Sequence, residues 1–204
     1  MTLLFRLSPL HRQTLATGRA AILTALLALA PLGAQAWDLV GPHAVVLHAR
    51  DGSRLQLGTI TLAPADNGRS AFKLAMDPAR FKDFFLPMQA FKCVEGGGEV
   101  FCHVPYPYPQ PGTDSAQPGG NDFAWLEHSL LLMFKTPAEF GAKLWNGVYF
   151  PLRLTDQGLE GLPQAVDLNR ISAPPDKPGP PPFRPALRDD IAPGARGFEW
   201  LTIE

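Results

Sequence analysis

Apolar residues in the first half of this chain recur mainly at every second position, in short runs that end at glycine, proline, asparagine or aspartate. Residues 44–48 form a short, continuous apolar run and residues 54–57 alternate, and with Asp51-Gly52 between them the pair is typical of a β-hairpin. The alternation changes phase at Gly58, and a glycine at such a change indicates a β-bulge. Residues 72–76 alternate again, so the sequence predicts a third strand there.

Two cysteines, Cys93 and Cys102, lie on either side of a glycine-rich turn. If Gly97-Gly98 form a two-residue hairpin turn with positive φ at both positions, the cysteines fall on a non-hydrogen-bonded pair of an antiparallel ribbon. Cα atoms are closest at such a pair, so a disulfide can close there. A redox dithiol or a metal-binding pair is the alternative, but redox cysteines usually stand two residues apart, and a metal needs more ligands than His103 supplies. The predicted register pairs Gly96 with Glu99, Glu95 with Val100, Val94 with Phe101 and Cys93 with Cys102.

Helical signals are few and short. Asp77-Pro78 is typical of an N-cap followed by proline at the first helical position, so we expect a short helix that carries the phenylalanines of residues 81–85. Residues 123–135 fit a helix or, over their second half, a buried strand, and periodicity alone does not decide between them. Residues 137–141 indicate a single helical turn.

Turn signals at Asn146-Gly147 and at residues 156–158 divide the second half into strands. Residues 148–154 alternate, and Pro151 confines this strand to a sheet edge or a bulge. Residues 159–168 predict a last strand. Together these patterns predict a mainly β domain, built as a single antiparallel sheet or a partly closed barrel with two or three short helices.

The composition changes near residue 173. Of the 22 prolines in the chain, seven lie within residues 174–185, and such a stretch does not support a packed element. We therefore predict a globular domain over residues 37–172 and a proline-rich tail over residues 173–204. The apolar residues at 198–203 either dock on the domain or a partner, or belong to a frayed end, and the sequence leaves both open.

Residues 1–36 have the layout of a cleavable secretory signal: arginines without any acidic residue, an apolar run over 20–32, and then Ala34-Gln35-Ala36. The apolar run is shorter than the roughly 20 residues that span a bilayer, which disfavours the alternative of a membrane anchor. We expect a periplasmic or secreted protein that begins at Trp37 and has no membrane span after cleavage. The formal net charge of −1 disfavours a nucleic-acid partner.

Residue types with catalytic potential are sparse. His43 and His48 are five residues apart, on opposite faces of a strand, and we expect neither a metal nor another cofactor. Glu127-His128-Ser129 contains the residue types of a hydrolase, but adjacent side chains do not point at one another, and no G-x-S-x-G motif occurs. A hydrolase that uses His128 with a carboxylate such as Asp122 or Glu127 is the alternative function.

Aromatic residues are the more suggestive feature. The candidate contacts for a ligand or partner lie beside a proline-rich loop or follow turns, and they are Tyr106, Tyr108, Trp145 and Tyr149. Exported β-rich domains often enclose a small apolar ligand or offer a docking groove. In the competing interpretation Trp145 and Phe150 are core residues, and the two tyrosines of the loop stack on prolines.

Residues 102–108, Leu126-Glu127-His128, residues 144–150 and Val166-Asp167-Leu168 resemble a family of exported bacterial proteins with no assigned function. The resemblance covers about residues 37–172. It implies a location in the bacterial envelope and no particular activity or catalytic residue. The sequence thus predicts a non-enzymatic exported protein that binds a small apolar ligand or an envelope protein, or a structural envelope protein whose tail reaches another component.

Overall fold

The computed structural model describes residues 37, 39–65, 70–86, 89–104, 106, 114–116, 123–171 and 182–204. For residues 83–86, 89–90 and 114–116 only the backbone is described. The predicted signal peptide, Tyr108, Asp122 and residues 172–181 lie outside the described residues. Contacts within the chain group Ala36–Glu204 as one unit, which is the part described below.

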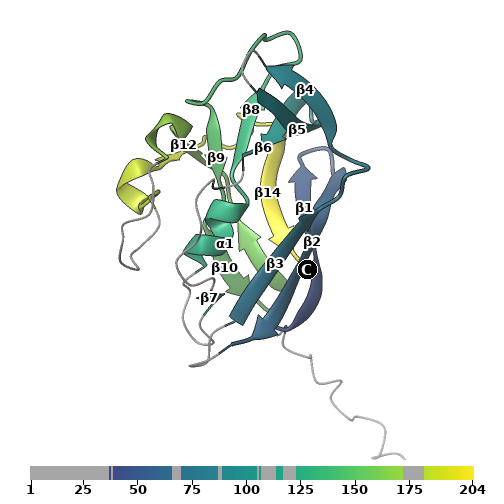
Figure 1. The fold of residues 1–204 in the computed structure, drawn as a ribbon, viewed down its shortest axis with the longest axis vertical. Helices are drawn as coiled ribbons and strands as arrows, with labels where there is room; N and C mark the ends of the chain where they lie inside the picture. Colours follow the sequence, from purple (N-terminus) through teal and green to yellow (C-terminus); the bar gives the residue numbers. More distant parts are fainter. Residues whose placement is uncertain are drawn as a thin grey trace, which may run out of the picture. The chain divides into compact units, whose positions relative to one another are not determined.

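The strands form two antiparallel sheets of seven (Figure 1). The first sheet has the order β10–β11–β14–β1–β2–β3–β7, and the second has the order β13–β12–β9–β8–β6–β5–β4. The strands of the first sheet are β1 Gly41–Ala49, β2 Arg54–Pro64, β3 Ser70–Met76, β7 Asp114–Ala116, β10 Leu152–Thr155, β11 Gly158–Gly161 and β14 Phe198–Ile203. Those of the second are β4 Lys82–Leu86, β5 Gln89–Gly96, β6 Glu99–His103, β8 Leu132–Lys135, β9 Gly147–Tyr149, β12 Gln164–Val166 and β13 Asp189–Asp190.

Side chains of both sheets meet in one apolar core, so the sheets pack face to face as a sandwich. Leu47 and Leu201 of the first sheet lie in the same core as Phe101 and Val148 of the second. The mainly β prediction is confirmed. The arrangement differs from the single sheet or barrel expected, because strands of the second sheet carry apolar residues on both faces and a second apolar cluster covers their outer side.

The two hairpins predicted from local sequence are present. The β1–β2 pairing slips by one residue opposite Gly58, which confirms the predicted bulge. A Cβ atom on Gly58 would lie 2.2 Å from the carbonyl oxygen of Ala75 on β3, so only glycine allows the neighbouring strand to approach this closely.

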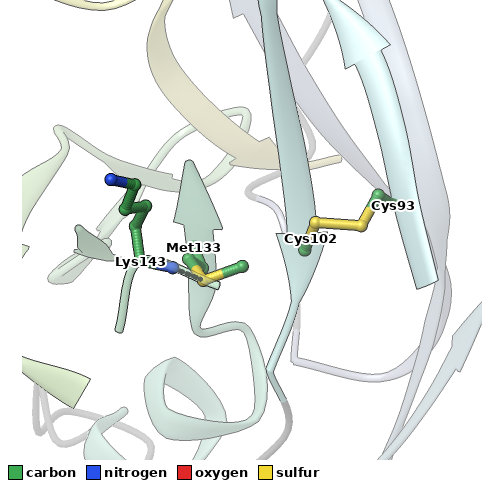
Figure 2. The surroundings of a disulfide bond; sticks show 4 residues. All are labelled: Cys93, Cys102, Met133 and Lys143. Atoms are coloured by element: carbon green, nitrogen blue, oxygen red, sulfur yellow. Dashed lines mark hydrogen bonds between the residues drawn. A yellow bond between two sulfur atoms is a disulfide. The ribbon is translucent and has the colours of Figure 1, made fainter. Parts of the chain in front are cut away.

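The disulfide is formed in the predicted register (Figure 2). Cys93 and Cys102 are paired across β5 and β6 with Cα atoms 3.9 Å apart, and Gly97 and Gly98 have φ values of 59° and 79°. Both cysteines are fully buried in the second apolar cluster. Figure 2 shows Met133 of β8 nearby, whose Sδ accepts the backbone N–H of Lys143 at 3.2 Å.

The helical predictions are largely wrong. Asp77 starts a turn, in which its carboxylate accepts the N–H of Ala79 at 2.9 Å, and the phenylalanine-rich run that follows is strand β4, because aromatic residues favour an extended chain that can pair with β5. Residues 137–141 form a turn and not a helical turn. The ambiguous stretch 123–135 contains both elements, α1 (Ala124–Ser129) and then β8. Two 3₁₀ turns, η2 (Leu168–Arg170) and η3 (Pro185–Leu187), are the other described helical elements.

The chain passes between the two sheets three times in its last third. It leaves β9 for β10 at Phe150-Pro151, returns from β11 to β12 at Leu162-Pro163, and leaves β13 for β14 through residues 191–197. The strands predicted over 148–154 and 159–168 are therefore each divided between two sheets. Pro151 precedes β10, an edge strand, as predicted.

The C-terminal end docks on the domain. Strand β14, yellow in Figure 1, lies between β1 and β11, so residues 198–203 occupy the interior of the first sheet although they follow the proline-rich stretch. Phe198, Leu201 and Ile203 are core residues. The domain therefore extends beyond residue 172, because the first sheet needs this strand to join β11 to β1.

Candidate functional site

A buried polar cluster joins α1 to the C-terminal segment. The Glu127 carboxylate accepts hydrogen bonds from the Tyr149 hydroxyl and from the backbone N–H of Leu152, the latter at 2.6 Å. The Arg188 guanidinium donates to the same hydroxyl at 2.9 Å, and its Cζ lies 3.8 Å from the centre of the Tyr149 ring. The cluster thus ties together α1, β9 and the chain just before β13.

His128 is fully buried, and both of its ring nitrogens contact backbone groups. Nδ1 lies 2.7 Å from the Ala124 carbonyl oxygen, and Nε2 accepts the N–H of Phe183 at 3.0 Å. A nitrogen that accepts a hydrogen bond carries no proton, so this arrangement holds a neutral ring with its proton on Nδ1. Burial lowers the pKa of His128 to about 4, and the positive charge of Arg188 acts in the same direction.

These contacts leave the hydrolase hypothesis without support in the geometry. A general base needs a ring nitrogen that faces the substrate, and both nitrogens of His128 are engaged inside the protein. The hydroxyl of Ser129 donates to the Trp125 carbonyl oxygen at 3.0 Å. Glu127 serves the buried cluster, and Asp122 lies outside the described residues.

The four aromatic candidates do not form one surface. Tyr149 is 0 % exposed and belongs to the buried cluster, and Tyr106 is 8 % exposed with its ring 5.7 Å from that of Trp125. Trp145 is 60 % exposed, so the interpretation of this residue as core is wrong, whereas Phe150 is a core residue. Tyr108 lies outside the described residues. Of the described candidates, Trp145 alone is available to a partner.

A different tryptophan, Trp200 on β14, forms the wall of a surface slot. His48 of β1 stacks on its ring, with centroids 4.9 Å apart and an angle of 9° between the planes, and the His48 Nε2 lies 2.8 Å from the Thr202 hydroxyl. Partial burial, followed by the charge of Arg54, lowers the pKa of His48. A neutral imidazole thus supports one face of the indole.

The slot lies on the other side of this indole. It has a volume of about 230 Å³, and its lining includes Leu162 and Pro163, which follow β11, but not His48 of β1. Because β1 and β11 flank β14 on opposite sides, the ring face away from His48 is turned toward the slot. Leu162 is 63 % exposed at its mouth. The full lining is Leu162, Pro163, Ile191, Ala192, Pro193, Gly194, Arg196, Phe198, Glu199 and Trp200.

A second hollow of about 470 Å³ adjoins the slot and is more polar. The two share Leu162, Pro163, Ile191 and Pro193, so they adjoin one another, and we call them together the Trp200 groove. The second hollow adds two interacting pairs: Arg153 with Glu160 at 3.0 Å, and Gln164 with Asp190 at 2.9 Å. The groove forms where the chain crosses between the sheets, because proline at each crossing has no N–H with which to continue a ladder.

A third hollow, of about 550 Å³, lies between the turns of the two hairpins and residues 194–197. It is larger than either of the other two hollows taken singly, and like the second hollow it is lined by paired charges, such as Arg196 with Glu99 at 2.7 Å. It has no aromatic wall. The Trp200 groove is therefore the better candidate for a binding site.

Comparisons of the chain with protein-family models, curated proteins and solved structures found no match. The resemblance to exported bacterial proteins stays a prediction. Within the described ranges, no three His, Cys, Asp or Glu side chains gather as a metal site would require. No helix in that part of the chain is long and apolar enough to cross a bilayer.

The sequence pattern does not point to the Trp200 groove. Trp200 belongs to the segment predicted to be a tail, and its partners Leu162 and Pro163 lie about 40 positions earlier in the chain. A usable signal is nevertheless present: Pro151 and Pro163 each stand next to an alternating run, where proline ends a ladder. Such positions mark places where strands end or change sheets.

Proposed function

We propose that this is an exported, non-enzymatic binding protein whose ligand occupies the Trp200 groove. The observation that carries the proposal is the indole of Trp200, which is supported on one face by His48 and turned toward a slot with the other. A preformed aromatic wall beside exposed apolar side chains is the usual architecture of a site for a small, partly apolar ligand.

The surroundings of Trp200 favour a rigid site. Strand β14 is held between β1 and β11, and Phe198 and Leu201 on either side of Trp200 are core residues. In the second sheet, Arg188, which directly precedes β13, donates a hydrogen bond to the Tyr149 hydroxyl, and this contact anchors the chain that continues through β13 to β14. A site that exists before the ligand arrives avoids the entropic cost of ordering loops, which favours affinity.

Export is part of the proposal and rests on the N-terminal layout together with the buried disulfide, which is typical of oxidising compartments. We expect the mature protein recovered from the periplasm or medium of an expressing bacterium to begin at Trp37. Mass spectrometry of its N-terminus tests this. A protein that retains residues 1–36 and remains in the cytoplasm contradicts the proposed location.

Binding in the groove is tested with N-phenyl-1-naphthylamine, a neutral apolar fluorescent probe. We expect it to bind the purified protein and Trp200→Ala to weaken its affinity about tenfold or more, because the aromatic wall is lost. Trp145→Ala is the matched control, since this exposed tryptophan lies outside the groove. Leu162→Asp provides a second test at an exposed position, where folding is not at risk.

The outcomes separate the alternatives. Unchanged affinity in both Trp200→Ala and Leu162→Asp contradicts a site in the groove. If Trp145→Ala is the one variant that loses affinity, the probe binds at Trp145, a candidate from the sequence analysis, and not in the groove. Circular dichroism and a thermal melt of each variant show that the fold is retained.

A further inference from the structure

We infer that the ligand of the Trp200 groove is a chain of pyranose sugars, an inference that rests on the proposed function. The juxtaposition that suggests it is an aromatic wall next to a hollow lined by charged and amide side chains. A ligand that fits both parts has an apolar face and a polar rim within one small ring.

The apolar part fits the face of a sugar ring. A pyranose with equatorial substituents presents its axial C–H groups on a flat face, and these groups are attracted to the electron-rich face of an indole. Trp200 offers one such face, because His48 covers the other. Pro163 and Leu162 line the same slot and bound it with apolar surface. The slot alone has about 230 Å³, below the usual size of a pocket for a drug-sized ligand, so it suits one ring.

The polar part fits hydroxyl groups. Arg153 with Glu160, and Gln164 with Asp190, hold each other's side chains in place in the adjoining hollow. Each carboxylate has further lone pairs, and the guanidinium and the amide have further N–H groups. A hydroxyl group both donates and accepts, so it can bridge such a pair without leaving either partner unmatched.

Two other ligand classes fit this chemistry less well. A purely apolar ligand that covered the second hollow would bury the Glu160 and Asp190 carboxylates without new partners, which is unfavourable. A proline-rich peptide offers carbonyl acceptors but few N–H donors, so the same carboxylates would gain nothing from it. The acceptors of the groove therefore favour a ligand rich in hydroxyl groups.

The second hollow points to a chain and not to a single sugar. It shares four lining residues with the slot, so a chain with one ring stacked on Trp200 has an adjoining hollow, lined by Glu160 and Gln164, for its next ring.

The test uses cellotetraose and chitotetraose as saccharide probes and decaproline as the peptide probe, measured by titration calorimetry with the purified protein. We expect at least one tetrasaccharide to bind, Trp200→Ala to weaken that binding about tenfold or more, and Trp145→Ala to leave it unchanged. Glu160→Gln keeps the shape of the side chain and removes the charge. It should weaken tetrasaccharide binding several-fold without weakening that of N-phenyl-1-naphthylamine.

The results distinguish the inference from the proposal beneath it. If the naphthylamine probe binds in the groove but neither tetrasaccharide does, the saccharide inference is overturned while the binding site stands. If decaproline binds and loses affinity in Trp200→Ala, the ligand is a proline-rich segment and the inference is likewise overturned. If no probe responds to Trp200→Ala, both the inference and the proposed site are wrong.

Discussion

Acidification should destabilise this protein, and the largest contribution should come from His128. The native ring is neutral, since its Nε2 accepts the Phe183 N–H. The pKa of His128 is lowered to about 4, and burial is the largest cause. In the unfolded chain a histidine takes up its proton near pH 6.5. Between these two values the unfolded state binds more protons than the native state, so stability is complete above about pH 6.5 and is lost as the pH falls toward 4.

The magnitude follows from the same two pKa values. Each unit of pKa corresponds to about 1.4 kcal/mol, so a fall from about 6.5 to about 4 corresponds to about 3 kcal/mol. Because the imidazole of His128 is 0 % exposed, solvent does not screen this energy as it would at the surface. Against a typical total stability of about 5–15 kcal/mol, the loss is large. Below pH 4 this residue should cause no further loss.

Denaturant unfolding of the wild type and of His128→Gln, from about pH 7.5 to 4, isolates the effect. Glutamine takes up no proton, and its carbonyl oxygen can still accept a hydrogen bond from Phe183. The free energy of unfolding of the wild type should fall by about 3 kcal/mol relative to that of the variant as the pH is lowered across this range. Burial also lowers the pKa of His103, so His103→Gln measures the part of the acid destabilisation that this second histidine adds.

Two stability results would refute this reasoning. One is a difference in the free energy of unfolding between wild type and His128→Gln that is the same at every pH. The other is a difference that grows on acidification, since it would mean that the native state prefers the charged ring, as in an ion pair with Glu127. An NMR titration of the His128 ring with a midpoint above 6.5 would contradict the lowered pKa directly.

Three further changes have expected effects on the free energy of unfolding, measured by denaturant at neutral pH. Cys93→Ala with Cys102→Ala should cost about 2–3 kcal/mol, because the unfolded chain loses its short closed loop. Gly197→Ala should cost about 1–3 kcal/mol, because its Cβ would lie 2.3 Å from the carbonyl oxygen of Gly97. Tyr149→Phe should cost about 1–3 kcal/mol, because it removes a buried hydroxyl that bonds two charged groups.

Each of these changes has a control. Reduction of the wild type should reproduce the loss in the double cysteine variant, and a variant as stable as the oxidised wild type would contradict a structural disulfide. Gly197 has no positive φ, so its substitution measures the contact alone, whereas Gly98→Ala, which meets nothing within 4 Å at a φ of 79°, measures the strain of a positive φ alone. A Tyr149→Phe variant of unchanged stability would show that the buried cluster does not stabilise the fold.

The site is less accessible to sequence reasoning than the fold is. Trp145 lies in the turn before β9 and Tyr149 is the last residue of that strand, yet one is 60 % exposed and the other is fully buried. Residue type does not distinguish them, because a tyrosine or tryptophan serves equally in a core and on a surface. Trp200 becomes a candidate only when β11 and β14 are seen to lie side by side.

The features that could be predicted correctly are short-range ones. The bulge at Gly58 and the register of the ribbon from Cys93 to Cys102 each depend on residues within about ten positions of one another. Over so short a distance the alternation of apolar residues, the position of glycine and the length of the turn together allow a single strand register. Only the tertiary structure decided which sheet each strand joins and that residues 198–203 lie between β1 and β11. Alternation shows which side of a strand is apolar but not which strand lies next to it. That choice depends on how the whole chain buries its apolar faces, and burial is a property of residues distant in sequence.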